Sequence, residues 1–217
     1  MIADTVLTGG TVGTSMRKGL QAVVMAGAMG AALALSAGQA HAATGVTANS
    51  AFITINAAAD KANQIIINPS GSNITIIDNG DTVTAGAGCT QLSANSVSCP
   101  AGTRTILLSA GDRNDTVILR ASLRATLNGD AGGDTLQTID STQRAVLVGG
   151  DGNDTLIGGA GDDEIVGGAG RDIMDGNSGN DRLGAIDGVG GNDSSNGDTG
   201  TDICPGDVGD QELGCES

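Results

Sequence analysis

The stretch "GGDGNDTLIGGAGDDEIVGGAGRDIMD" (residues 149–175) consists of three nine-residue units that follow one another without a gap. Each unit begins with Gly-Gly and has glycine in the fourth place, aspartate in the sixth and an apolar residue in the eighth. Glycine adopts backbone angles that strain other residues, so the first six places are suited to a tight turn. The last three places, such as "TLI", are suited to a short strand whose central residue faces a core. The pattern predicts a stack of turns and strands.

Weaker copies of the unit extend the pattern in both directions. They are "AGDRNDTVI" (110–118), "GDAGGDTLQ" (129–137) and, three residues after the fourth strict unit "GNSGNDRLG" (176–184), "GVGGNDSSN" (188–196) and "GDTGTDICP" (197–205). The early copies are spaced by roughly two units, so the repeating object is a coil of about eighteen residues, and such a repeat predicts a solenoid. The eighth-place residues expected to face its core are Val117, Leu136, Leu156, Ile165, Met174 and Leu183.

The sixth-place aspartates have a chemical consequence. Units that are two apart lie on the same side of the coil, so Asp154 is expected to pair with Asp172, and Asp163 with Asp181. Carboxylates this close repel each other unless one is protonated or a cation lies between them. Calcium accepts about six to eight carboxylate and carbonyl oxygens in a flexible cage, whereas magnesium demands a stricter octahedron. Soft metals would need histidine or thiolate ligands. We therefore predict several bound calcium ions.

A disordered linker rich in glycine and aspartate is the alternative. The strict phase of the units, with apolar eighth places, argues against disorder when calcium is bound. Without calcium, disorder is the expected state of residues 149–217, which carry 16 acidic and only 2 basic residues and few large apolar groups to offset chain entropy. The free energy of calcium binding would then drive folding.

The units resemble the glycine-rich nonapeptide G-G-x-G-x-D-x-U-x of the RTX, or hemolysin-type, calcium-binding proteins. Four near-contiguous copies at 149–184 carry the resemblance, and weaker copies extend it from 110 to 205. It implies an all-β fold, a parallel β-roll or β-solenoid over residues 109–205, with calcium held between successive turns. The ligands that it implies are Asp134, Asp154, Asp163, Asp172 and Asp181, together with Asp115, Asp193 and Asp202 in more degenerate units.

The chain departs from the usual pattern of this family. RTX proteins typically leave bacteria through a type I exporter that reads an uncleaved C-terminal signal, and their repeats often follow a large catalytic or toxin domain. Here the sequence contains no H-E-x-x-H or G-x-S-x-G motif, and it ends in a cysteine couple. We expect a small secreted relative with residues 206–217 as a cysteine-tethered C-terminal cap.

Residues 1–42 have the order of a secretory signal peptide. Arg17 and Lys18 precede the apolar run "AVVMAGAMGAALAL" (22–35), and Ala40 and Ala42 occupy the small-residue places of a cleavage site. Met16, directly before the basic pair, is a candidate translation start. The alternative is an uncleaved membrane anchor, but the run is short for a membrane span and rich in alanine and glycine. We therefore expect a secreted, extracellular protein.

The composition of the expected mature chain excludes several function classes. Only Asp4 among the 25 acidic residues, and only two of the 10 basic ones, lie in 1–42, so cleavage leaves a formal charge of −16. Such a chain is not expected to bind nucleic acid or an anionic membrane, but it should attract cations. Its single histidine, His41, leaves with the signal peptide, and Phe52 is its one aromatic residue. Ser-His triads, histidine-ligated zinc and aromatic stacking platforms are thereby excluded.

Four cysteines are present, and they fall into two local couples. An even number in a secreted chain indicates disulfides, for which three connectivities are possible. We favour Cys89–Cys99 and Cys204–Cys215. A zinc site built from all four thiolates is the rival, but no C-x-x-C spacing supports it.

Residues 43–108 are predicted to be rich in short strands. "AFITIN" (51–56), "QIIIN" (64–68), "NITIID" (73–78) and "TRTILL" (103–108) are rich in β-branched and apolar residues and are separated by turn-forming residues. The cysteine-bounded stretch between Cys89 and Cys99 is expected to be a hairpin or loop. Whether this segment joins the same solenoid is left open by the sequence.

The leading hypothesis is a calcium-binding extracellular module with a structural or adhesive role and no catalytic residues. One alternative is an enzyme that acts on polysaccharide with carboxylates on a β-solenoid. Another is a flat β face that binds a surface or a partner. The sequence does not identify an extracellular or cell-surface partner.

Overall fold

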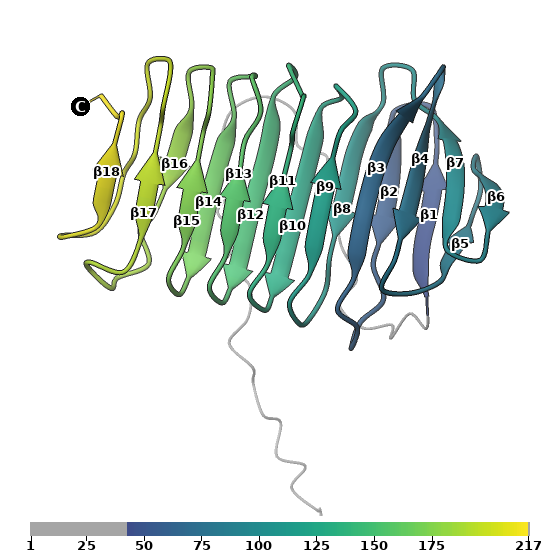
Figure 1. The fold of residues 1–217 in the computed structure, drawn as a ribbon, viewed down its shortest axis with the longest axis horizontal. Coiled ribbons are helices and arrows are strands. Elements are labelled where there is room, and N and C mark those ends of the chain that lie inside the picture. The colour runs from purple at the N-terminus through teal and green to yellow at the C-terminus, as the bar shows by residue number, and fades with distance from the viewer. Residues whose placement is uncertain (1–42, 217) are drawn as a thin grey trace, which may run out of the picture. The chain divides into compact units, whose positions relative to one another are not determined.

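The structure, a computed structural model, describes residues 43–216, and its regular elements there are all β-strands. The predicted signal peptide at 1–42, with Met16 and His41, lies outside the described residues. No helix in the described part of the chain is long and apolar enough to cross a membrane. The strands form two sheets, shown one behind the other in Figure 1.

The first sheet has eight strands. In spatial order these are β16 (Arg182–Gly184), β14 (Glu164–Ala169), β12 (Ala145–Asp151), β10 (Ala125–Ala131), β8 (Thr105–Ser109), β2 (Phe52–Asn56), β1 (Thr44–Ala48) and β5 (Val83–Ala85).

The second sheet has ten strands. In spatial order these are β18 (Gln211–Leu213), β17 (Ser194–Asn196), β15 (Ile173–Asp175), β13 (Thr155–Ile157), β11 (Thr135–Gln137), β9 (Thr116–Leu119), β3 (Gln64–Ser70), β4 (Asn73–Asp78), β7 (Ser96–Pro100) and β6 (Thr90–Ser93).

From β8 to β17 the chain alternates between the sheets, so that each coil there contributes one strand to each of them (Figure 1). Successive strands of a sheet are parallel from β2 to β16 and from β3 to β18. This is a parallel β-solenoid, as predicted. The six eighth-place residues predicted to face the core are all at most 1% exposed, because alternate strand residues point inward.

The N-terminal segment shares both sheets with the repeats. β2 pairs in parallel with β8, and β3 pairs in parallel with β9, so β2 and β3 form the first coil. β1 and β4 then pair antiparallel with β2 and β3 and cover the open end of that coil. The predicted cysteine-bounded hairpin is β6–β7, closed by the Cys89–Cys99 disulfide. The second predicted disulfide, Cys204–Cys215, is also present.

Fourth-place glycines allow the turns of neighbouring coils to stack backbone on backbone. Gly152 and Gly170 have φ angles of 144° and 138°, which L side chains rarely adopt. A Cβ atom on Gly170 would lie well under 3.0 Å from the carbonyl oxygen of Gly152 in the preceding coil, and one on Gly152 would overlap Gly132 in the same way. The glycines of the repeat are therefore required by contact between coils as well as by turn geometry.

Candidate metal sites along the turns of the solenoid

Two rows of buried aspartates follow the turns of the solenoid. The long row lies where the chain enters the ten-stranded sheet, and the short row lies where it enters the eight-stranded sheet. The long row consists of Asp115, Asp134, Asp154, Asp172 and Asp193, and the short row consists of Asp163, Asp181 and Asp202. These are the eight aspartates singled out in the sequence, and each is at most 3% exposed.

One carboxylate oxygen of each aspartate joins neighbouring coils. In the long row the backbone N–H of Asp134 donates to Oδ1 of Asp154 at 2.7 Å, and that of Asp154 donates to Oδ1 of Asp172 at 2.9 Å. In the short row the N–H of Asp163 donates to Oδ1 of Asp181 at 2.7 Å. The structure thus brings together the pairs predicted from the nine-residue period. The same N–H to Oδ1 contact forms where successive row aspartates are 21 rather than 18 residues apart, because the extra residues lie in the loops between the strands.

The second oxygen, Oδ2, is buried and accepts no hydrogen bond in seven of the eight aspartates. These are Asp115, Asp134, Asp154, Asp172, Asp181, Asp193 and Asp202. Asp163 differs, because its Oδ2 accepts the N–H of Gly159 at 2.8 Å. A buried carboxylate oxygen without a donor is costly, so this recurrence indicates that something else supplies positive charge.

Carbonyl oxygens lie next to the unpaired carboxylate oxygens. The position that a Cβ atom of Gly129 would occupy is less than 3.0 Å from both Oδ2 of Asp134 and the carbonyl oxygen of Gly149 in the next coil. The same arrangement recurs at Gly149, with Asp154 and the carbonyl oxygen of Gly167. Two acceptor oxygens therefore border the same space beside each of these glycines. A cation is the partner that both can share.

The described residues contain no group of three or more His, Cys, Asp or Glu side chains that could hold a metal ion together. A cation at these turns would therefore be held by one or two carboxylates and by backbone carbonyl oxygens. Such an all-oxygen, carbonyl-rich set fits calcium, which tolerates irregular cages of backbone and carboxylate oxygens. It does not fit metals that prefer nitrogen or sulfur ligands.

Comparison with known families agrees with this geometry. Residues 148–183 match, in four copies, the sequence model of the RTX calcium-binding nonapeptide repeat. These residues are RTX calcium-binding repeats. No curated protein and no solved structure matches the chain.

The RTX repeats contain four of the eight row aspartates, namely Asp154, Asp163, Asp172 and Asp181. Asp115, Asp134, Asp193 and Asp202 lie outside the matched residues, yet they repeat the same burial and the same unpaired Oδ2. The structural pattern therefore extends beyond the segment that the RTX family identifies.

Burial raises the pKa of several row aspartates. It raises the pKa of Asp115 and Asp181 to about 7, and that of Asp134 and Asp172 to about 6. Hydrogen bonds from backbone N–H groups partly oppose this shift, whereas neighbouring carboxylates add to it. The carboxylates of these RTX-type turns are thus poised to exchange a proton for a cation near neutral pH.

We predict that acid partly restores order to the chain when metal is chelated. In the unfolded chain these carboxyls titrate near 3.8, whereas in the folded chain four of them titrate at about 6 to 7. Between these values the folded state binds more protons, so its stability is greatest at low pH and is lost as pH rises through about 6 to 7. Each pKa unit corresponds to about 1.4 kcal/mol.

Far-UV circular dichroism in EDTA should therefore show a stronger β signal at about pH 5 than at about pH 7.5. With calcium present the order should reverse, because protons compete for the same oxygens. A β signal in EDTA that is the same or weaker at the lower pH would contradict the raised pKa values.

Three row members were not predicted from the sequence, namely Asp210, Glu216 and Asn63. The N–H of Asp193 donates to Oδ1 of Asp210 at 3.3 Å, and the N–H of Asp202 donates to Oε2 of Glu216. At the other end, Asn63 occupies the place before Asp115, whose Oδ1 accepts the Asn63 N–H at 2.6 Å. "GDVGDQEL" (206–213) contains the glycine and aspartate signal in degenerate form. Asn63 has no such signal, because its turn, "AAADKAN" (57–63), contains no glycine.

Proposed function

We propose that this chain is a secreted calcium-binding module whose aspartate-rich coils fold when calcium binds, and that it serves a structural or adhesive role outside the cell. The observation that carries the proposal is the recurrence of a buried, unpaired Oδ2 next to a carbonyl oxygen of the following coil. The match to RTX repeats supports calcium as the ion.

Different groups of the chain have different roles at each turn. Oδ1 of a row aspartate accepts a backbone N–H of the preceding coil and so fixes the direction of the carboxylate. The glycines let that carboxylate approach the backbone, because a side chain on Gly149 or Gly167 would overlap it. Oδ2 and nearby carbonyl oxygens are then left to hold the ion. Bound calcium supplies the positive charge that allows these oxygens to stay buried together.

The net charge of the C-terminal part agrees with this assignment. Residues 149–217 have 16 acidic and 2 basic residues, and the two ion pairs among the described residues involve Arg113 with Asp60 and Arg144 with Glu164. The row aspartates have no basic partner in these pairs. Divalent cations would offset the repulsion between coils that stack strand on strand.

A structural role is favoured over polysaccharide cleavage by the position of the carboxylates. A catalytic carboxylate must reach the scissile bond of its substrate. The row aspartates are buried, and one oxygen of each bonds to the backbone. Secretion is supported by the two disulfides, which form in oxidising compartments.

The proposal is tested by calorimetric titration of residues 43–217 with calcium, alongside the variants Asp154→Asn and Asp151→Asn. Both variants remove one negative charge, but Asp151 is exposed and lies outside the rows. We expect the wild type and D151N to bind the same number of ions, and D154N to lose at least one. Dissociation constants should be on the order of 10⁻⁴–10⁻³ M, as in extracellular calcium modules.

Two results would count against the proposal. The first is the absence of calcium-dependent heat at about ten times that concentration range. The second is an equal loss of ions in D151N and D154N, because this would indicate that calcium binds the diffuse surface charge.

A further inference from the structure

Asn63 stands at the N-terminal end of the long row, in the place that aspartate occupies in every later coil. It is 1% exposed, and its N–H donates to Oδ1 of Asp115 at 2.6 Å, which is the contact that links successive row members. Its side chain, however, is an uncharged amide. The first coil therefore has the backbone arrangement of the row without the carboxylate.

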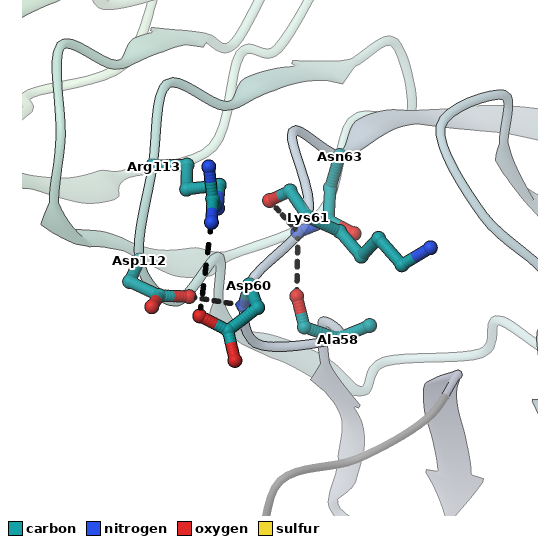
Figure 2. Close-up of polar contacts among 6 residues, drawn as sticks. All are labelled: Ala58, Asp60, Lys61, Asn63, Asp112 and Arg113. Atoms are coloured by element: carbon teal, nitrogen blue, oxygen red, sulfur yellow. Dashed lines mark hydrogen bonds and ion pairs between the residues drawn. The ribbon is translucent and has the colours of Figure 1, made fainter.

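The amide nitrogen of Asn63 lies among four oxygen atoms. Nδ2 is 3.1 Å from the carbonyl oxygen of Ala58, 3.3 Å from that of Lys61, 3.1 Å from that of Ala110 and 3.1 Å from Oδ1 of Asp115. Two of these oxygens belong to its own turn, which Figure 2 shows, and two belong to the next coil. Carbonyls from adjacent coils plus one carboxylate are the kinds of ligand that the later turns offer to a cation.

The contact with Ala110 makes the correspondence specific. Ala110 holds the first place of its unit, as Gly149 does in a later one. In the later coil the first-place carbonyl and the unpaired Oδ2 of Asp134 both lie next to the position that a Cβ atom of Gly129 would occupy, so two acceptors border the same space. In the first coil the equivalent carbonyl accepts a hydrogen bond from Asn63. The amide thus supplies a donor where the repeats present a second acceptor.

Charged side chains of both signs lie around this turn. Figure 2 shows Lys61 on the turn and Arg113 on the next coil, 3.9 Å from Asp60. The backbone N–H of Asp60 also donates to Oδ1 of Asp112. The exposed ion pair contributes little stability, and Asp60 and Asp112 offset the two basic residues, so the amide of Asn63 is what distinguishes this turn from those that follow.

We infer that the side-chain amide of Asn63 takes the place of a calcium ion at the first turn, so that the row of metal sites ends there and the first coil folds without metal. The inference rests on the proposed calcium-binding function. It assigns Asn63 as the residue that sets where metal dependence begins along the chain.

The test is the substitution Asn63→Asp, with Asn63→Ala as its control. Oδ1 of Asn63 is itself buried without a partner, so a carboxylate would place two unpaired oxygens among the carbonyls. We expect N63D to bind one more calcium ion than the wild type in a titration. In EDTA its Tm should fall by about 5 °C or more, and calcium should restore it. N63A should lose a similar Tm with and without calcium, and its ion count should not change.

A second variant, Asp115→Asn, keeps the test decisive if N63D does not fold. An amide at this position should repeat the arrangement of Asn63 one coil later. We expect D115N to bind at least one ion fewer than the wild type and to be more stable than the wild type in EDTA.

The outcomes distinguish failure of this inference from failure of the proposed calcium-binding function. If the wild type binds calcium but N63D binds the same number of ions, or D115N is less stable than the wild type in EDTA, the inference is overturned and the proposed function stands. If the wild type binds no calcium, both are overturned.

Discussion

In excess EDTA at about pH 7.5, the amides of residues 149–213 are expected to exchange rapidly with solvent deuterium, while those of residues 44–108 stay protected. Addition of calcium should restore protection to the C-terminal part. The reason is that stability is distributed unevenly along the solenoid, and a repeat structure with contacts only between neighbours can open from one end.

The difference lies in what fills the core. The first coil buries two isoleucines from each strand, Ile53 and Ile55 from β2 and Ile65 and Ile67 from β3. In contrast, β14 and β15 bury one large side chain each, Ile165 and Met174. At about 2 kcal/mol for each buried aliphatic side chain, a C-terminal coil lacks roughly 4 kcal/mol of the hydrophobic stabilisation that the first coil has.

The C-terminal coils also carry unpaired carboxylates that a cation would have to satisfy. They therefore have less hydrophobic stabilisation than the first coil and also need a cation to fold. Hydrogen exchange read by mass spectrometry on the disulfide-intact chain would resolve the two parts. Uniform loss of protection along the chain, or full protection of residues 149–213 in EDTA, would show that the two parts do not differ in metal-free stability as predicted.

The substitution Gly170→Ala is expected to destabilise the folded chain strongly, although it adds only one methyl group. Gly170 has a φ of 138°, and a Cβ atom there would overlap the carbonyl oxygen of Gly152. The backbone strain alone is about 1–3 kcal/mol, and the overlap forces neighbouring coils apart. We expect Tm in saturating calcium to fall by about 10 °C or more.

Gly184→Ala is the matched control. Gly184 lies in β16 of the same repeat region, it has no positive φ, and its nearest neighbours to a new Cβ atom are 3.8 Å and 4.0 Å away. Its replacement should leave Tm within about 2 °C of the wild type, since surface substitutions without strain change stability little. Similar Tm values for G170A and G184A would show that the turns do not stack as the structure has them.

Much of the fold follows from the nine-residue period. Strict spacing placed the inward residues, such as Leu156 and Met174, and it paired Asp154 with Asp172 on one side of the coil. The two disulfides were predictable because each couple is local, and both are confirmed. Such inferences are reliable in a repeat, because knowing which residues of one unit point inward determines which residues of every later unit do so.

The rest could not be predicted, because its cause lies in contacts between coils. The period showed that carboxylates would meet, but it did not show that a backbone N–H of one coil satisfies Oδ1 of the next. Asn63 joins the row through its position beside Asp115, although its turn has neither glycine nor aspartate at the expected places. The place of β2 and β3 as the first coil likewise depends on pairing with β8 and β9.

The alternation of the chain between two sheets limits how this protein can change in length. Neighbouring nonapeptides lie in different sheets, as Leu156 in β13 and Ile165 in β14 show. Loss or gain of a single nonapeptide would send every later aspartate to the opposite row and would misalign the strands after it. Loss or gain of a pair preserves both rows and leaves the terminal strands with their partners. Duplication and deletion in this part of the gene are therefore compatible with the fold only in even numbers of units.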